Sequence, residues 1–191
     1  MPPTVNVEFW TGGSSGSPGS KTDSSNFRFR TDDSPSTIDT TNPVPIPDTG
    51  INYSFWIHTA INWSGTYDEI SNIRFYTDGS LGYALGTDGQ VALGNRDSGD
   101  LGCPEASYEP ATGTVGTSGD DLGSTHAYYS GQTTSEVDAF SFTSGSPAQI
   151  DSNTYTTDGS SYAAVIQADV DTDASAGVQT NETFTFLYDD I

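Results

Sequence analysis

SYAAVIQADVD, residues 161–171, is the stretch that decides the fold. Read in steps of two, its first face is apolar or aromatic throughout: Tyr162, Ala164, Ile166, Ala168 and Val170. The opposite face is mixed: Ala163, Val165, Gln167, Asp169 and Asp171. Successive side chains of a strand point to opposite faces, so an alternation with a period of two residues predicts a β-strand.

A second strand closes the sequence. Phe184, Phe186 and Tyr188 share one face of residues 183–188. We expect this strand to pair with residues 161–171 as an antiparallel hairpin across the connection formed by residues 173–181.

Shorter runs of the same kind occur upstream. Turn signals such as Asp78-Gly79 and Asp88-Gly89 separate some of these runs. The runs cover residues 26–31, 51–61, 70–76, 81–85, 91–93 and 137–142. In the first run, Phe27 and Phe29 lie on the face opposite Arg28 and Arg30. No window shows a helical period, so we predict an all-β fold, an antiparallel β-sandwich that is jelly-roll-like.

The length fits one main domain with an appendage. We expect residues 1–25 to form an N-terminal strand and a Gly/Ser-rich arm, and residues 26–191 to form the β-sandwich domain with a long Gly/Ser/Asp-rich loop at about 94–131. Residues 42–47, NPVPIP, favour an extended polyproline conformation. We expect this segment to be either a loop or an arm which, like residues 4–10, can add to a neighbouring subunit.

The charge is extreme: 26 Asp and Glu stand against 5 Lys and Arg, a net charge of −21. Repulsion among so many carboxylates is tolerable where salt screens it, so we expect a high-salt environment. Disorder is the competing interpretation, and an aromatic content of 12% argues against it. Residues 1–10 lack the basic and apolar regions of a signal peptide, and no run spans a membrane, so we expect neither export nor membrane insertion.

Candidate catalytic groups are few. His58 lies inside an aromatic strand pattern, where a packed histidine is the simpler interpretation, and His126 has no nucleophile motif near it. Cys103, the single cysteine, precedes a proline in the Gly-rich loop and is expected to be inert. We therefore predict no catalytic residues, no metal ligands and no enzyme activity.

Asp169, Asp171 and Asp173 match the first half of a calcium loop, but position six is Ala174 and position twelve is Thr180. We expect a hydrated acidic edge with Asp169 and Asp171 on the solvent face, and no cofactor. A structural Ca²⁺ or Mg²⁺ ion is the open alternative. A negative surface with no basic patch beyond two arginines also predicts no nucleic-acid partner.

Trp10, Trp56 and Trp63 leave a second function open. They could serve as stacking platforms for sugars, which makes a carbohydrate-binding or carbohydrate-active β-sandwich the alternative. The simpler interpretation places these rings at a buried sheet face or, in a self-associating protein, at a subunit contact. The sugar-binding alternative predicts Trp56 or Trp63 exposed in a groove.

Residues 162–170, 174–177 and 181–191, the last reading NETFTFLYDDI, resemble the closing hairpin of small β-structured virion proteins of tailed viruses. Those proteins often end in a T-x-T-x-x-Y-D-E strand, and the run Phe75-Tyr76-Thr77-Asp78-Gly79 is similar to another piece of them. The resemblance implies a virion structural protein assembled in the host cytoplasm: a capsid decoration, a vertex or turret protein, or a head-tail or tail component. It implies a homo-oligomer, with a trimer or pentamer favoured, and other virion proteins as partners.

Overall fold

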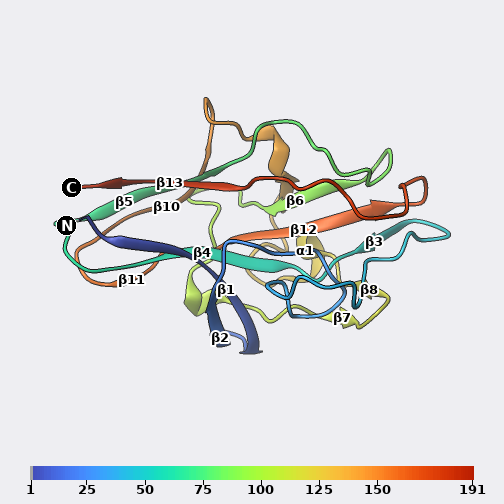
Figure 1. The fold of residues 1–191 in the computed structure, drawn as a ribbon, viewed down its shortest axis with the longest axis horizontal. Helices are drawn as coiled ribbons and strands as arrows, with labels where there is room; N and C mark the ends of the chain where they lie inside the picture. Colours follow the sequence, from blue (N-terminus) through green and yellow to red (C-terminus); the bar gives the residue numbers. More distant parts are fainter. Residues whose placement is uncertain (1) are drawn as a thin grey trace.

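Two antiparallel sheets make up the computed structural model, which describes residues 2–191 (Figure 1). The larger, ten-stranded sheet contains β1 (Thr4–Ser14), β2 (Ser17–Asp23), β3 (Ile51–Tyr53), β4 (Ile57–Ser64), β6 (Gln90–Gly94), β7 (Gly113–Thr114), β8 (Ser118–Gly119), β9 (Glu136–Asp138), β11 (Gly159–Ser160) and β12 (Ala164–Asp171). The smaller sheet has the order β10 (Ala148–Tyr155), β5 (Ile70–Tyr76), β13 (Thr185–Asp190). Three one-turn helices complete it: η1 (Glu105–Ser107), α1 (Leu122–Thr125) and η2 (Ala139–Ser141). The prediction of an all-β sandwich is confirmed.

Strand β12 is the centre of the larger sheet. One edge pairs with β4 and β3, and the other pairs with β6, so that Ile166 lies between Ile57 and Leu93. The predicted hairpin between β12 and the C-terminal strand is wrong, because β13 pairs with β5 in the smaller sheet. Both edges of β12 are occupied, so it offers no free backbone groups to β13.

The main core lies between the two sheets. From β12 it receives Ala164, Ile166, Ala168 and Val170, the apolar face seen in the sequence. The opposite face of the same strand is covered as well, because Val165 packs with Trp56, Cys103, Leu122 and Tyr129. Residues 94–131, expected to be a long loop, thus cover the outer face of the larger sheet.

The N-terminal segment is part of the sheet. Residues 4–10 were expected to reach a neighbouring subunit, but they pair with β4 from Thr4 opposite Ser64 to Trp10 opposite His58. Phe9 and Trp10 are buried. The Gly/Ser-rich remainder folds back as the β1–β2 hairpin, which projects from the body (Figure 1). Residue 1 of the expected 1–25 segment lies outside the described residues.

Residues 26–31 do not form the expected strand, although Phe27 and Phe29 pack against the core. Their backbone is bonded irregularly, since Arg28 N–H donates to Pro35 O and Thr31 N–H donates to Asn42 O. Residues 81–85 also lack strand structure, Ser54–Trp56 interrupt the run 51–61, and the run 137–142 turns into η2 after Asp138.

Arg30 holds the loop that follows it. Its side chain is only 4% exposed. The guanidinium donates from Nε and Nη2 to the two carboxylate oxygens of Asp32, both at 2.7 Å, and from Nη1 to Asp39 Oδ1 at 2.8 Å. One of the five cations is therefore buried in the protein's own structure and does not belong to a surface patch.

Candidate functional site

The two histidines meet in the interior. His58 comes from β4 and His126 directly follows α1, and their Nε2 atoms are 3.1 Å apart. Cys103 completes the group, because one ring nitrogen of each histidine and the Cys103 Sγ all lie within 4.8 Å of one another. The side chains are enclosed, with exposed fractions of 1% for His58 and 0% for Cys103 and His126. We call these three residues the HCH cluster.

Each member of the HCH cluster is held by its own backbone contacts. His58 lies opposite Trp10 of β1 and Val165 of β12 in the sheet register. Cys103 exchanges two backbone hydrogen bonds with Ala163, at 2.8 and 2.9 Å. The turn before His126 is fixed by Gln167, whose Oε1 accepts from the Leu122 N–H at 2.8 Å.

Aromatic rings surround the cluster. Trp10 stacks on the His58 ring, and the Tyr108 ring centre is 4.6 Å from that of His58. Trp56 and Tyr129 lie against His126, with ring centres at 5.4 and 5.0 Å. Gly94 of β6 lets Tyr129 approach, because a Cβ at position 94 would lie 2.5 Å from the tyrosine ring. The cluster therefore lies in an enclosure formed largely by aromatic rings, with the Glu8 carboxylate bonded to the outer ring, Trp10.

Burial sets the protonation of the cluster. It lowers the pKa of His126 to about 4 and, together with the neighbouring His126, lowers the pKa of His58, so both imidazoles are neutral at neutral pH. His126 Nδ1 accepts from the Tyr128 N–H at 3.3 Å, so the ring proton is on Nε2 and is donated to His58. Burial raises the pKa of the Cys103 thiol, whose Sγ donates to Ser107 O at 3.2 Å.

Neutral imidazole nitrogens and a cysteine sulfur are ligand atoms for transition metals. Taken one at a time in the sequence, His58, Cys103 and His126 predict no metal site. The three are separated by 45 and 23 positions, which matches no short ligand motif, so the sequence contains no local signal for their convergence.

A second polar group lies where β6, β9 and β12 are adjacent. Gln90 Nε2 donates to Asp169 Oδ2 at 3.0 Å and to Glu136 Oε1 at 3.4 Å. The other oxygens, Asp169 Oδ1 and Glu136 Oε2, are buried without a hydrogen-bond partner. The pKa of Asp169 is raised to about 7, chiefly by burial and to a lesser extent by the nearby carboxylates of Glu136 and Asp121.

The expectation of a hydrated acidic edge is thus wrong for Asp169, which is 4% exposed. The cause is the cover over the second face of β12. Asp171 and Asp173 have other roles, since they accept from the backbone N–H groups of Asp88 and Thr87 in the turn before β6. The three carboxylates of the D-x-D-x-D run bind separate partners.

The tryptophans are all interior. Their exposed fractions are 2% for Trp10, 3% for Trp56 and 2% for Trp63. Each indole N–H has an acceptor: Glu8 Oε1, Glu109 O and Thr157 O respectively. This burial agrees with the expectation of a buried sheet face. Within residues 2–191, none of the three rings is exposed as a sugar platform or as surface for a subunit contact.

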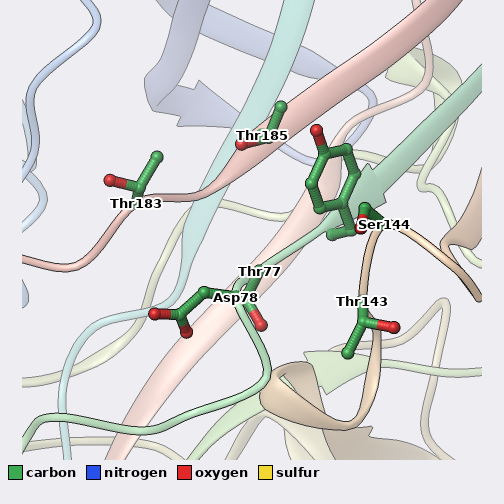
Figure 2. Close-up of a pocket in the computed structure, with 7 residues that line it drawn as sticks. Thr77, Asp78, Thr143, Ser144, Thr183 and Thr185 are labelled. Atoms are coloured by element: carbon green, nitrogen blue, oxygen red, sulfur yellow. The ribbon is translucent and has the colours of Figure 1, made fainter.

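Hollows in the surface include the following two. The one in Figure 2, about 420 Å³, is lined by hydroxyl groups and one carboxylate: Tyr76, Thr77, Asp78, Thr143, Ser144, Thr183 and Thr185. The other, about 600 Å³, lies beside β1 and residues 181–186, and its lining combines aromatic rings such as Phe9 and Phe27 with polar side chains such as Asn26. Each has a single carboxylate in its lining, Asp78 or Glu182, and neither lining contains a histidine or cysteine.

Comparison of the chain with protein-family models, curated proteins and solved structures finds no match. Membership of the virion-protein group named above therefore stays a prediction. Among residues 2–191, no helix has the length and apolar character needed to cross a bilayer.

Proposed function

We propose that this protein is a non-catalytic structural component of a virus particle from a strongly saline environment, and that it acts by self-association and by docking with other particle proteins. The observation that carries the proposal is the free edge of β13. Among the described residues this strand pairs with β5 alone, so its other edge presents backbone donors and acceptors. Such an edge is a template for adding a strand from a neighbouring chain.

The side chains of this edge suit a contact. Phe184 and Phe186 turn inward against Phe75, which keeps the strand in place. Leu187 is 39% exposed and Ile191 is 69% exposed, so apolar surface accompanies the free backbone groups. They fall within residues 181–191, one of the stretches in which the sequence resembles virion proteins.

Charge makes this contact dependent on salt. Asp189 and Asp190 lie on the same strand. A second copy of the chain also has a net charge of −21, so the two copies repel each other at the contact. At about 1 M salt the Debye length is roughly 3 Å, so this repulsion is screened while apolar contact persists. Association in brine and dissociation in dilute buffer follow.

The chemistry of the interior also supports a non-catalytic role. Both histidines face each other in a closed enclosure, away from the surface hollows. Each of the two hollows described above has one carboxylate and no histidine in its lining, so neither offers the side chain most often used for acid–base catalysis. We propose a cyclic trimer or pentamer, because particle positions favour closed rotational symmetry.

The test is sedimentation equilibrium in concentrated and dilute KCl. The wild-type chain should form a closed oligomer in high salt, and Leu187→Lys should shift it toward monomer. Val115→Lys is the matched control, because Val115 is 62% exposed and lies in the β7–β8 turn, away from β13 (Figure 1). Antibodies against the chain should also label purified virus particles. A chain that stays monomeric in high salt and is absent from particles would refute the proposal.

A further inference from the structure

We propose that the HCH cluster binds a single Cu⁺ ion. This inference is independent of the proposed particle role. It depends on the convergence of two imidazoles and one sulfur, all within 4.8 Å, in an enclosure formed by aromatic rings.

The separations suit one shared ion. Imidazole nitrogens lie about 2.0 Å from a bound ion of this size, and two of them 3.1 Å apart then subtend roughly 100° at the metal. A thiolate at about 2.3 Å would lie about 3.6–3.8 Å from each nitrogen. Since the largest separation in the cluster is within 4.8 Å, the sulfur needs to approach by no more than about 1 Å. Rotation of the Cys103 side chain can supply this movement while its backbone stays bonded to Ala163.

The number of ligands favours copper. Among residues 2–191, no fourth His, Cys, Asp or Glu joins the group. Structural zinc sites use four protein ligands, whereas two histidines and one cysteine in a trigonal arrangement, with a weak axial group such as a backbone oxygen, are typical of copper. Ser107 O, 3.2 Å from the Cys103 sulfur, is a backbone oxygen close to the cluster.

Charge favours the monovalent ion. Two neutral imidazoles, one thiolate and Cu⁺ sum to zero, while Zn²⁺ would leave a net positive charge in an enclosure with fully buried ligands. An uncompensated buried charge is costly. The rings of Trp10, Trp56, Tyr108 and Tyr129 add no charge of their own, and the two charged groups that act on the Cys103 thiol, Glu109 and Arg96, have opposite signs. The enclosure thus disfavours the divalent ion.

The competing explanation is a metal-free hydrogen bond between the two histidines. In that state the His126 proton is on Nε2, and the thiol proton is donated to Ser107 O. Binding of the ion breaks both hydrogen bonds. The His126 ring proton moves from Nε2 to Nδ1, which ends the long hydrogen bond that Nδ1 accepts from the Tyr128 N–H. The thiol proton of Cys103 is released to solvent. Each Cu⁺ ion therefore releases one proton, and no electron is transferred.

The experiment uses the full chain, reduced and under nitrogen, titrated with Cu⁺ against a chromogenic Cu⁺ chelator. We expect one ion per chain, X-ray absorption showing one sulfur and two nitrogen neighbours, and an apparent affinity that rises tenfold per pH unit around neutrality. Loss of groups that only support a metal ligand weakens binding 10- to 100-fold, so Cys103→Ser, which removes a ligand, should weaken it by about 100-fold or more. Glu105→Gln is the control for surface carboxylates, since Glu105 is exposed, and it should leave the affinity unchanged.

A Cys103→Ser chain that fails to fold does not remove the test, because the sulfur neighbour and the pH slope are measured on the wild-type chain. Titration with Zn²⁺ is the second arm, and Zn²⁺ should fail to displace Cu⁺. Absence of stoichiometric uptake, or a copper spectrum with oxygen neighbours only, overturns the proposal and leaves the hydrogen-bonded pair. Stoichiometric Zn²⁺ binding that excludes Cu⁺ overturns the choice of metal.

Discussion

Replacing Asp169 with asparagine should stabilise the protein at neutral and alkaline pH. The folded state raises the pKa of this carboxyl from 3.8 to about 7, chiefly through burial. Its folded form therefore binds a proton more tightly than the unfolded chain does. Between about pH 4 and pH 7 the free energy of unfolding must then fall as pH rises, and above this range the contribution is constant.

The size of the effect follows from the shift. About three pKa units at 1.36 kcal/mol each set an upper limit of about 4 kcal/mol. The asparagine side chain keeps an oxygen that can accept the hydrogen bond from Gln90. Its amide group takes the place of the Asp169 Oδ1 atom, which is buried and has no hydrogen-bond partner. We expect the variant to gain about 1–3 kcal/mol at pH 8 and to match the wild type within about 1 kcal/mol at pH 4.5.

The assay is guanidinium unfolding at a series of pH values from about 4.5 to 8 and at constant high ionic strength. Asp171→Asn is the matched control on the same strand, and it should retain the wild-type slope. Glu136 and Asp121 face Asp169, and burial raises the pKa of Glu136 too, so a smaller slope should remain in the Asp169→Asn chain. A variant that keeps the full wild-type slope would show that this carboxyl is not the buried group that titrates.

Three further outcomes test the structure. The melting temperature should rise steadily between about 0.1 and 3 M KCl as the Debye length shortens, and a value independent of salt would contradict the role given to the −21 charge. Arg30→Ala should lower the free energy of unfolding by about 3 kcal/mol and speed amide exchange in residues 31–43, because Asp32 loses a buried partner; unchanged exchange would exclude this anchor. Gly94→Ala should destabilise the chain by more than about 1 kcal/mol, measured by urea unfolding, because the new methyl group overlaps the Tyr129 ring; a neutral result would mean that the ring can move aside.

Alternation in the sequence predicted where strands occur better than it predicted their partners. The periodicity found β5, β6, β12 and β13, since each directs apolar side chains of one face against the main core. Pairing depends on which strand edges are free in the folded sheet. The sequence of one strand does not show which other strand will pair with it. The partner of β13 was therefore missed, although its inward residues were correctly identified.

Strand β10 was missed for a different reason. Its sequence, AQIDSNTY, turns a carboxylate inward at Asp151, which is 0% exposed. The Asp151 oxygens accept from the Asn153 side chain, the Tyr155 hydroxyl and the Tyr162 N–H, so its burial is compensated. The pairing of β10 with β5 also shifts register beside this residue. In the sequence, Asp151 breaks the alternation of apolar and polar residues, although its carboxylate is buried with hydrogen-bond partners. The alternation therefore did not predict β10.

Residues 94–131 show how order can arise without a repeating pattern. They contain no long helix or strand, yet Cys103, Tyr108 and His126 are fully buried. The sequence does contain the cause, on the mixed face of 161–171: Ala163 and Val165 are apolar on the side opposite the core, and apolar side chains on both faces of a strand require cover on both. Only a long connection can supply that cover here, because the smaller sheet occupies the other side. The cover brings Cys103 and His126 to His58, so the HCH cluster follows from a sheet whose two faces both had to be closed.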